Sequence, residues 1–432
     1  MGIWLLIAFC VCLFLGVPVF VCIGVVMFLP VLFDPGFSAS AEFMVRSAVN
    51  GVDSTTLLAL PLFILAGNIM GAGGISKRLF DVFAVLTGKR SGGIPIAVIL
   101  TSVVYAAICG SGPAATAAVG AMAIPVMRHL KYKDEFSCVV SSAGGGIGII
   151  IPPSMAFITY SVLSGSSVGD LFTAGFVPGL LLAAVLITFI VLYCRRAGED
   201  KEAVAKNYEA LCAKGKGKVF KDGILALLSP VIVLGGIYAG IVTPTEAAVI
   251  SVFYSLIVCM FVYKSINLKK LKDICVQSIG GYAGIGIMMA FSAGVSRTLA
   301  IENIDSLLKD FVVNTFSSPA IFLAVISVIM LIFGMFLDCL PFTCLATPIL
   351  VPILNAMGIN LIHFGVIMTI LTSVGMISPP YGINLFVSSG LAGIQTSKTF
   401  KIAIYFCIAY LIVTAILMYV PGISLFLVNI LK

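Results

Sequence analysis

Two stretches of the sequence combine a double proline with glycines inside apolar segments. One runs from Gly144–Gly148 to Pro152–Ser154, and the other runs from Gly375 to Gly382. Each double proline removes two backbone donors and disfavours helix in the residue before it. In a bilayer the freed carbonyls are costly unless they are buried in protein or bind a ligand. Carbonyls and hydroxyls at such breaks suit a hard cation such as sodium, and half-helix N-termini suit a carboxylate.

Two further breaks interrupt apolar segments and predict the tips of helical hairpins. They lie at Cys109–Pro113 and at Gly334–Asp338. Prolines and glycines of this kind also kink or pack membrane helices without binding anything. Four breaks at matched positions favour a binding site, because broken helices paired by an inverted repeat are a typical place for one in transporters.

Asp338 lies in the apolar stretch Leu331–Leu340 without a basic neighbour in the sequence. An unpaired ionisable group at that depth costs a few kcal/mol, so it marks a functional position. A cation ligand and a proton carrier both explain it. The alternative is a hairpin tip that water reaches, where the carboxylate needs no partner.

Arg297 ends the apolar run Ile285–Ser296. Its planar guanidinium could hold a carboxylate through two parallel hydrogen bonds. It could equally extend to the membrane surface along its aliphatic stem. The sequence leaves both interpretations open.

These residues belong to a chain that must be embedded in lipid. Of its 432 residues, 60% are hydrophobic and only 10% are charged, and the mean hydropathy is +1.19. A soluble domain needs more polar surface, whereas a spanning helix needs about 20 apolar residues, and this chain has many such stretches. The opening run Ile3–Leu32 is predicted to be one retained first helix, because it is too long for a signal peptide and lacks a charged leader.

The same composition argues against several other classes of protein. The net charge of +7 comes from loops, so it concerns membrane topology and not nucleic acid. No Walker A pattern is present, so we expect no ATP hydrolysis. The twelve cysteines contain no CxxC pair, and His129 and His363 are far apart in sequence. Disulfide, zinc and membrane-enzyme interpretations are therefore weak.

The chain contains an internal repeat with an offset of 227 residues, which predicts related segments over 54–194 and 281–421. The offset also places Ser111 on Asp338. The whole chain has only 19 prolines, so three coincidences at one offset are hard to assign to chance. The coinciding pairs are Pro125 and Pro352, Pro152 and Pro379, Pro153 and Pro380, and Gly148 and Gly375.

Basic residues predict opposite orientations for the two repeats. The loop 128–135 carries Arg128, Lys131 and Lys133, whereas its counterpart 355–362 carries no basic residue. Positive charge favours the cytoplasmic side of a membrane, so the repeats are predicted to be inverted.

The expected fold class is an all-α polytopic membrane protein of two inverted-topology repeats, each with a re-entrant helical hairpin and a broken helix. The charges agree with nine crossings and two hairpins, with the N-terminus inside and the C-terminus outside. The hairpins would cover 92–127 and 319–354. The predicted parts are an N-terminal scaffold helix and connection (1–53), the first repeat (54–194), a cytoplasmic loop with two linking scaffold helices (195–280), the second repeat (281–421) and a C-terminal end (422–432).

Six ordered sequence blocks resemble the large membrane subunit, of the DctM type, of tripartite ATP-independent periplasmic (TRAP) transporters. The resemblance covers nearly the whole chain, and six blocks in order are far more specific than any one of them. The blocks are Leu57–Asn68, Gly110–Ala117, Ile151–Ser154, Leu171–Gly179, Thr243–Ala248 and Pro379–Asn384.

This resemblance implies a transporter of the bacterial inner membrane that depends on partners. They would be a small four-helix membrane subunit of the DctQ type, expected here as a separate chain, and a soluble periplasmic substrate-binding protein. The resemblance implies sodium symport of a small organic anion, such as a C4-dicarboxylate, a sialic acid or another sugar acid. The architecture would be of the elevator type known from ion transporters, in which a substrate domain moves against a scaffold with arms near 77–89 and 305–314.

The resemblance also implies two Na⁺ sites and a substrate site. The first Na⁺ would join the first tip to its neighbouring break, through Ser111, Gly112, Gly146, Gly148, Pro152 and Ser154. The second would join the other tip and break, through Gly334, Asp338, Thr372, Gly375 and Pro379. The substrate would meet Arg297, Ser111, Ser154 and Asp338. Gly112 is followed by Pro113, where many relatives have a small hydroxyl residue, so the first site would depend more on backbone carbonyls.

A proton-coupled organic-anion carrier without sodium sites is the nearest alternative, with Asp338 titrating instead of binding Na⁺. A channel would need a continuous polar lining or a carbonyl filter. Two hairpins that enter from opposite sides suit alternating access better than a channel.

Overall fold

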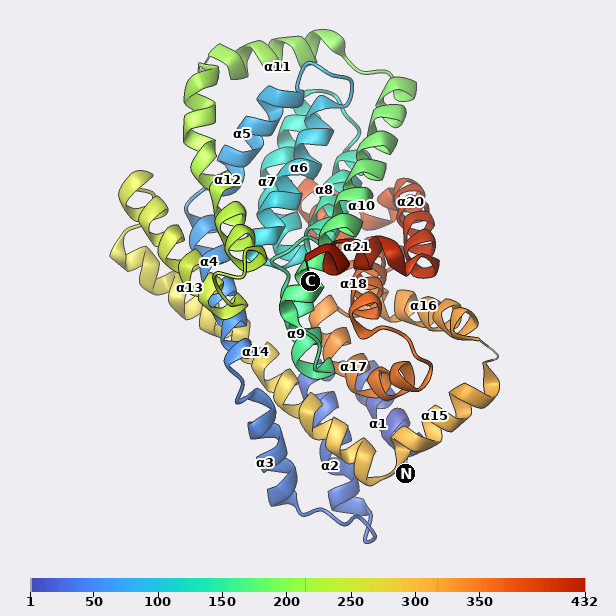
Figure 1. Cartoon of the computed structure of the whole chain (residues 1–432). Helices are drawn as coiled ribbons and strands as arrows, with labels where there is room; N and C mark the ends of the chain where they lie inside the picture. Colours follow the sequence, from blue (N-terminus) through green and yellow to red (C-terminus); the bar gives the residue numbers. More distant parts are fainter. Residues whose placement is uncertain (1, 214, 317, 432) are drawn as a thin grey trace.

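The computed structural model describes residues 2–213, 215–316 and 318–431 of the chain. Within these ranges the regular secondary structure is helical (Figure 1). Eight of the described helices are long and apolar enough to cross a membrane. The predicted all-helical membrane class is therefore confirmed.

The N-terminal part forms three helices, so the prediction of a single helix over 3–32 was wrong. α1 (Gly2–Phe14) and α2 (Val19–Phe33) are separated by a turn at Gly16, and α3 (Ala41–Val52) follows. Gly16 has a φ of +76°, which glycine adopts without steric cost. Pro18 then precedes the first residue of α2, a position at a helix start where proline is tolerated. α2 and α3 both pack against α14 (Leu268–Ile301).

The helices of the first half include a pair joined by a tight turn, Gly93–Cys109 and Gly112–His129, and after it a pair separated by a break, Asp134–Gly148 and Met155–Ser164. A short 3₁₀ turn at Thr55–Leu58 precedes these elements. They are α4 (Ala59–Ala72), α5 (Ile75–Thr87), α6 (Gly93–Cys109), α7 (Gly112–His129), α8 (Asp134–Gly148), α9 (Met155–Ser164) and α10 (Val168–Ala197).

The second half follows the same order of elements. The starts of α6 to α9 recur as the starts of α16 to α19 at offsets of 226 to 228 residues. After α14, the elements are α15 (Ile304–Thr315), α16 (Pro319–Phe336), α17 (Cys339–Ala356), α18 (Leu361–Ile377), α19 (Ile383–Ala392), a 3₁₀ turn (Thr396–Thr399), α20 (Phe400–Tyr419) and α21 (Pro421–Leu431).

The segment between the halves is more helical than the sequence indicated. The stretch 195–222, predicted to be a loop, contains the end of α10, all of α11 (Lys201–Ala213) and the start of α12 (Lys216–Tyr238). α13 (Pro244–Leu256) follows and ends in a π-helical turn. Figure 1 shows α11 crossing one end of the molecule between α10 and α12, next to α5. The prediction failed because alternating charges suit a solvated helix face as well as a loop.

The two halves pack across each other at their helix breaks. α7 packs against α19, α17 packs against α9, and α8 packs against α18. Each hairpin therefore contacts the broken helix of the other half as well as that of its own half. This exchange brings the tips and breaks of the two halves together, with Gly112 and Ser154 buried, Ser111 and Asp338 half-buried and Pro380 exposed.

Hydrogen bonds fix the base of the first hairpin to the end of α10. The Glu199 carboxylate accepts hydrogen bonds from the Ser91 hydroxyl (2.7 Å) and the Gly92 amide (2.8 Å), and the Tyr132 hydroxyl also donates to it. Burial, followed by the hydrogen bond to Glu199, raises the pKa of the Tyr132 hydroxyl. The segments before α6 and after α7 are thus held by one carboxylate.

The neighbouring ion pair of Lys131 and Asp200, 2.7 Å apart, predicts a dependence of stability on acid pH. The hydrogen bond from Lys131, assisted by the Ala203 amide, holds the pKa of the Asp200 carboxyl below its usual range. Because the pKa is lower in the folded state, this contribution is fully present above about pH 4 and is lost as the pH falls through the folded pKa. We expect Asp200→Asn to reduce thermal stability slightly at pH 7 and to flatten its acid dependence, since the pair is exposed. Melting curves in detergent at a series of pH values would check this, and an unchanged acid dependence would contradict it.

Candidate functional site

The first hairpin tip lies against the start of α9. Gly110 ends α6 with a φ of +65°, and the Ser111 hydroxyl accepts a hydrogen bond from the Ala114 amide (3.4 Å) as the N-cap of α7. A Cβ added to Gly110 would lie 2.6 Å from Met155 Cγ. The tip therefore sits directly against the residue that follows Ser154.

The other side of the first tip touches the glycine-rich end of α8. A Cβ added to Gly145 would lie 2.6 Å from the Gly112 carbonyl oxygen and 2.1 Å from Thr116 Oγ1. A Cβ added to Gly148 would lie 1.8 Å from Ala106 Cβ in α6. These glycines therefore allow α6 and α7 to approach α8 closely.

The first helix break extends from Ile149 to Ser154. The Ser154 hydroxyl donates to the Ile149 carbonyl (2.5 Å) and accepts from the Phe157 amide (3.4 Å), so it closes the break and caps α9. Pro152 and Pro153 are joined by a cis peptide bond, as are Pro379 and Pro380 in the second break.

The second hairpin tip is shorter than the sequence indicated. α16 continues to Phe336, so Gly334 lies in its last turn and the break consists of Leu337 and Asp338. The placement of Gly334 in the turn was wrong, because a glycine near the end of an apolar helix does not have to end it. Asp338 is half-buried and is the N-cap of α17, with its Oδ1 accepting from the Cys339 amide (2.6 Å). Ser111 and Asp338 thus occupy the same place in their hairpins.

Three of the predicted second-site residues meet at van der Waals distance. A Cβ added to Gly375 would lie 2.4 to 2.7 Å from the backbone C, O and Cα of Gly334, and a Cβ on Gly334 would lie 3.4 Å from the Thr372 carbonyl oxygen. Cys339 Sγ lies 3.1 Å from Thr372 Oγ1, which brings the residue after Asp338 to the same place. The Ser378 hydroxyl, just before Pro379, donates to the Val374 carbonyl (2.7 Å).

Buried polar oxygens that the sequence interpretation missed lie beside the first tip. Thr116 Oγ1 and Asn384 Oδ1 are buried without a hydrogen-bond partner among the described residues, and Ser373 Oγ is buried with the Tyr410 hydroxyl as its neighbour. The Asn384 amide donates to the Ser142 carbonyl (3.2 Å) and would lie 3.4 Å from a Cβ on Gly112. A Cβ on Gly146 would lie 2.8 Å from Ser373 Oγ.

A buried oxygen without a hydrogen-bond partner lowers the stability of the fold, and a bound ligand would remove that cost. Hydroxyl, amide and carbonyl oxygens are the ligand atoms that a hard cation prefers, so the residues present fit Na⁺. Asn384 is the last residue of the sixth sequence block, and this position was the one indication in the sequence that Asn384 belongs to the site. Nothing in the sequence connected Thr116 or Ser373 with it, because the three residues lie on different helices.

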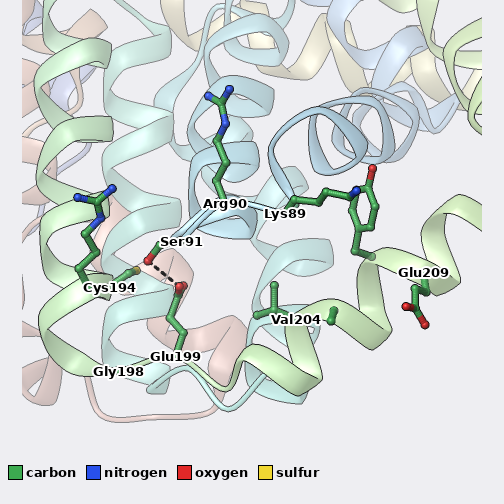
Figure 2. A pocket seen from close by; sticks show the side chains of 12 residues that line it. Lys89, Arg90, Ser91, Cys194, Gly198, Glu199, Val204 and Glu209 are labelled. Carbon is green, nitrogen blue, oxygen red and sulfur yellow. Dashed lines mark hydrogen bonds between the residues drawn. The ribbon is translucent and has the colours of Figure 1, made fainter.

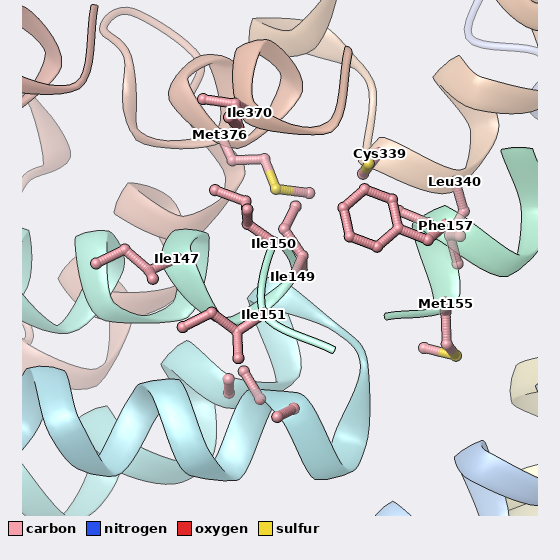
Figure 3. Packing of buried hydrophobic residues seen from close by; sticks show 14 of the residues in the cluster. Ile147, Ile149, Ile150, Ile151, Met155, Phe157, Cys339, Leu340, Ile370 and Met376 are labelled. Carbon is pink, nitrogen blue, oxygen red and sulfur yellow. The ribbon is translucent and has the colours of Figure 1, made fainter. Parts of the chain in front are cut away.

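Apolar side chains separate the two breaks. Figure 3 shows Ile150 and Phe157 from the first half next to Met376 and Cys339 from the second half. All four are buried.

Arg297 lies on α14 and is exposed, and its guanidinium makes no hydrogen bond or ion pair with the described residues. α14 packs against α17, the helix that Asp338 caps. The structure therefore leaves the Arg297 side chain free and does not join it to either tip.

Comparisons with known proteins agree with this arrangement. The family described as "Tripartite ATP-independent periplasmic transporter, DctM component" matches residues 6–423. The chain is 35% identical over 418 residues to the isethionate TRAP transporter permease protein DctMQ of Oleidesulfovibrio alaskensis, covering 97% of this chain but 65% of that relative. It is 36% identical to the C4-dicarboxylate TRAP transporter large permease protein DctM of Pseudomonas aeruginosa, covering 87% and 86%. It is 31% identical to the sialic acid TRAP transporter large permease protein SiaM of Vibrio cholerae, covering 96% and 95%.

The fold is also similar to those of solved transporters with little sequence identity. MtrF of Neisseria gonorrhoeae gives a TM-score of 0.64 at 13% identity, over 93% of this chain and 94% of MtrF. The YdaH transporter of Alcanivorax borkumensis gives 0.61 at 13% identity, over 94% and 98%. At this identity the likeness concerns the fold alone.

Proposed function

Because the chain belongs to the family of DctM components of tripartite ATP-independent periplasmic transporters, we propose that it moves a small organic anion into the cell by sodium symport. Membership of that family makes it a transport permease and not an enzyme. Together with its apolar helices, it places the chain in the bacterial inner membrane.

The observation that carries the proposal is the contact of each hairpin tip with a helix break. At the first tip, the buried Thr116 hydroxyl and the Asn384 side chain lie beside the contact of Gly112 with Gly145, and both have an oxygen without a hydrogen-bond partner among the described residues. At the second, Gly334, Thr372 and Gly375 meet beside the Asp338 cap. A Na⁺ at either contact would be held by oxygens of both the tip and the break, so the tip would close only with the ion present.

Transport would follow from the inverted arrangement of the two halves. One hairpin would open toward each side of the membrane, and α5 and α15 would be arms of the scaffold against which the hairpins and breaks move, elevator-fashion. Sodium coupling would arise because a closed tip requires Na⁺, and the substrate moves only behind a closed tip. The matching order of helices in the two halves supports this proposal.

The substrate proposed is a carboxylate or related acid. Relatives carry names for C4-dicarboxylate, sialic acid and isethionate transport, which share a small anionic group. The unpaired guanidinium of Arg297 is suited to such a group, with Ser111, Ser154 and Asp338 as the polar residues at the tips and the first break. A small DctQ-type membrane subunit and a periplasmic binding protein that delivers the substrate complete the proposed system.

Uptake into proteoliposomes tests the proposal directly. The chain would be reconstituted with its small subunit, and the binding protein with labelled anion would be added outside, with and without an inward sodium gradient. We expect uptake to require sodium and to continue when the pH gradient is collapsed. Uptake that persists after sodium is replaced by another cation, and that is lost with the pH gradient, would instead establish the proton-coupled alternative.

A further inference from the structure

A hollow of about 900 Å³ lies at the end of the molecule that α11 crosses, away from both helix breaks. The turn after α5 and the corner between α10 and α11 form its walls (Figure 2). Its lining includes three basic residues, Lys89, Arg90 and Arg195, together with Glu199 and Glu209. By the charge argument given above for the loops, this end faces the cytoplasm.

The described acidic residues of the hollow form no ion pair with these cations. Both carboxylate oxygens of Glu199 are occupied by neutral donors, the Ser91 hydroxyl, the Gly92 amide and the Tyr132 hydroxyl. Figure 2 shows Ser91 turned toward Glu199, whereas Arg90 next to it extends away from that carboxylate. The Glu209 side chain is exposed and lies further along α11.

Two guanidinium groups are left without a partner. Neither Arg90 nor Arg195 makes a side-chain hydrogen bond or an ion pair with any residue that the structure describes. Lys89 is differently placed, because its ammonium lies 5.2 Å from the centroid of the Tyr208 ring. A planar guanidinium matches the oxygens of a phosphate bidentately, so two unpaired guanidiniums in one hollow suit a phosphate group.

An exposed leucine precedes each of the two arginines along the chain. Leu86 is 56% exposed and precedes Arg90 by four residues, and Leu192 is 53% exposed and precedes Arg195 by three. On α10 that spacing places Leu192 and Arg195 on one face of the helix. On each side of the hollow an exposed apolar side chain therefore precedes a cation by three or four residues, a sequence order that suits a surface where acyl chains meet headgroups.

We propose that this hollow binds the phosphate of an anionic phospholipid headgroup between Arg90 and Arg195. The acyl chains would lie along the surfaces that carry Leu86 and Leu192. A bound headgroup would bridge the turn before the first hairpin and the end of α10, the same two segments that Glu199 joins. The site is separate from the proposed sodium and substrate sites, and it does not depend on sodium coupling.

Binding of defined lipids to the purified full chain tests the proposal. Native mass spectrometry in detergent would compare phosphatidylglycerol with phosphatidylcholine of the same acyl chains, in wild type, Arg90→Gln, Arg195→Gln and the double variant. Arg196→Gln is the matched control, because Arg196 is exposed in the same helical turn but does not line the hollow. We expect about fivefold weaker phosphatidylglycerol binding for each lost lining arginine, about 25-fold for both, and wild-type binding for the control.

A second measurement separates a lipid from a free ion. Thermal melting of the delipidated chain would be followed with added inorganic phosphate and with added phosphatidylglycerol. Stabilisation by the lipid alone, lost in the double variant, supports the proposal. Equal stabilisation by inorganic phosphate, lost in the same variant, supports the phosphate site but assigns it to a free ion. Phosphatidylglycerol binding no tighter than that of phosphatidylcholine, or equal losses for Arg195→Gln and Arg196→Gln, overturns the proposal.

Discussion

Replacing Asp338 with asparagine is expected to reduce sodium-driven uptake at least about tenfold while leaving the chain folded. Asp338 Oδ1 accepts a hydrogen bond from the Cys339 amide, and an asparagine oxygen can accept the same bond, since the two residues are about equally good N-caps. Only the negative charge is lost. A tenfold change in affinity requires about 1.4 kcal/mol, which is less than the attraction of a carboxylate for an adjacent cation at an effective dielectric constant of about 20.

Asp338→Ala, which loses both the N-cap hydrogen bond and the negative charge, is the variant for comparison. If the charge matters, the two variants lose uptake alike, although Asp338→Ala is the less stable by about 1 kcal/mol. If Asp338 only caps α17, then Asp338→Asn transports like wild type and only Asp338→Ala is impaired. Uptake and melting curves for both variants distinguish these results.

The same pair of variants separates sodium binding from proton transfer. A sodium ligand predicts that Na⁺ raises the melting temperature of wild type and that this increase is smaller in Asp338→Asn, in which only the first proposed site still binds the ion. A proton carrier predicts no sodium-dependent increase in either protein, with uptake that follows the pH gradient. Loss of uptake together with an unchanged sodium effect on melting would contradict a role of Asp338 in the second sodium site.

The helix breaks could be predicted from the sequence because proline and glycine act locally. The end of α6 at Cys109 and the break before Ser154 both follow from residues within a few positions. The turn at Gly16 was missed because it lies in an apolar run whose hydrophobicity is continuous. α11 was missed because its many charged residues led to the prediction of a loop, although charged residues also occur on the exposed face of a helix.

The candidate site was less predictable because it depends on contacts between helices that are far apart in the chain. Thr116, Ser373 and Asn384 lie on α7, α18 and α19, and only the packing of α7 against α19 and of α8 against α18 brings them near Gly145 and Gly146. A repeat offset relates equivalent positions in the two halves, but it does not show which helices of opposite halves touch. The predicted Na⁺ ligands were therefore confined to the tips and breaks, with each set taken from one half of the chain.

Gly375→Ala is expected to destabilise the chain by about 1 to 3 kcal/mol, the usual cost of overpacking, and to reduce uptake. The new Cβ would lie 2.4 to 2.7 Å from three backbone atoms of Gly334, and a backbone cannot rotate away as a flexible side chain can. The last turn of α16 would have to move away from α18, and the Asp338 cap, four residues on, would move with it.

Gly390→Ala provides the matched control for this prediction. Gly390 is also helical and lies in α19, but a Cβ there would meet nothing within 4 Å, so alanine should be neutral or stabilise by about 0.5 to 1 kcal/mol. Melting in detergent with and without Na⁺ then separates packing from ion binding. If the contact of Gly375 with Gly334 closes the second sodium site, Gly375→Ala shows a smaller sodium-dependent increase in melting temperature and Gly390→Ala keeps the full increase. A Gly375→Ala variant that is destabilised but responds to Na⁺ as strongly as wild type would show that this contact serves packing alone, and the second ion would then have to be held elsewhere.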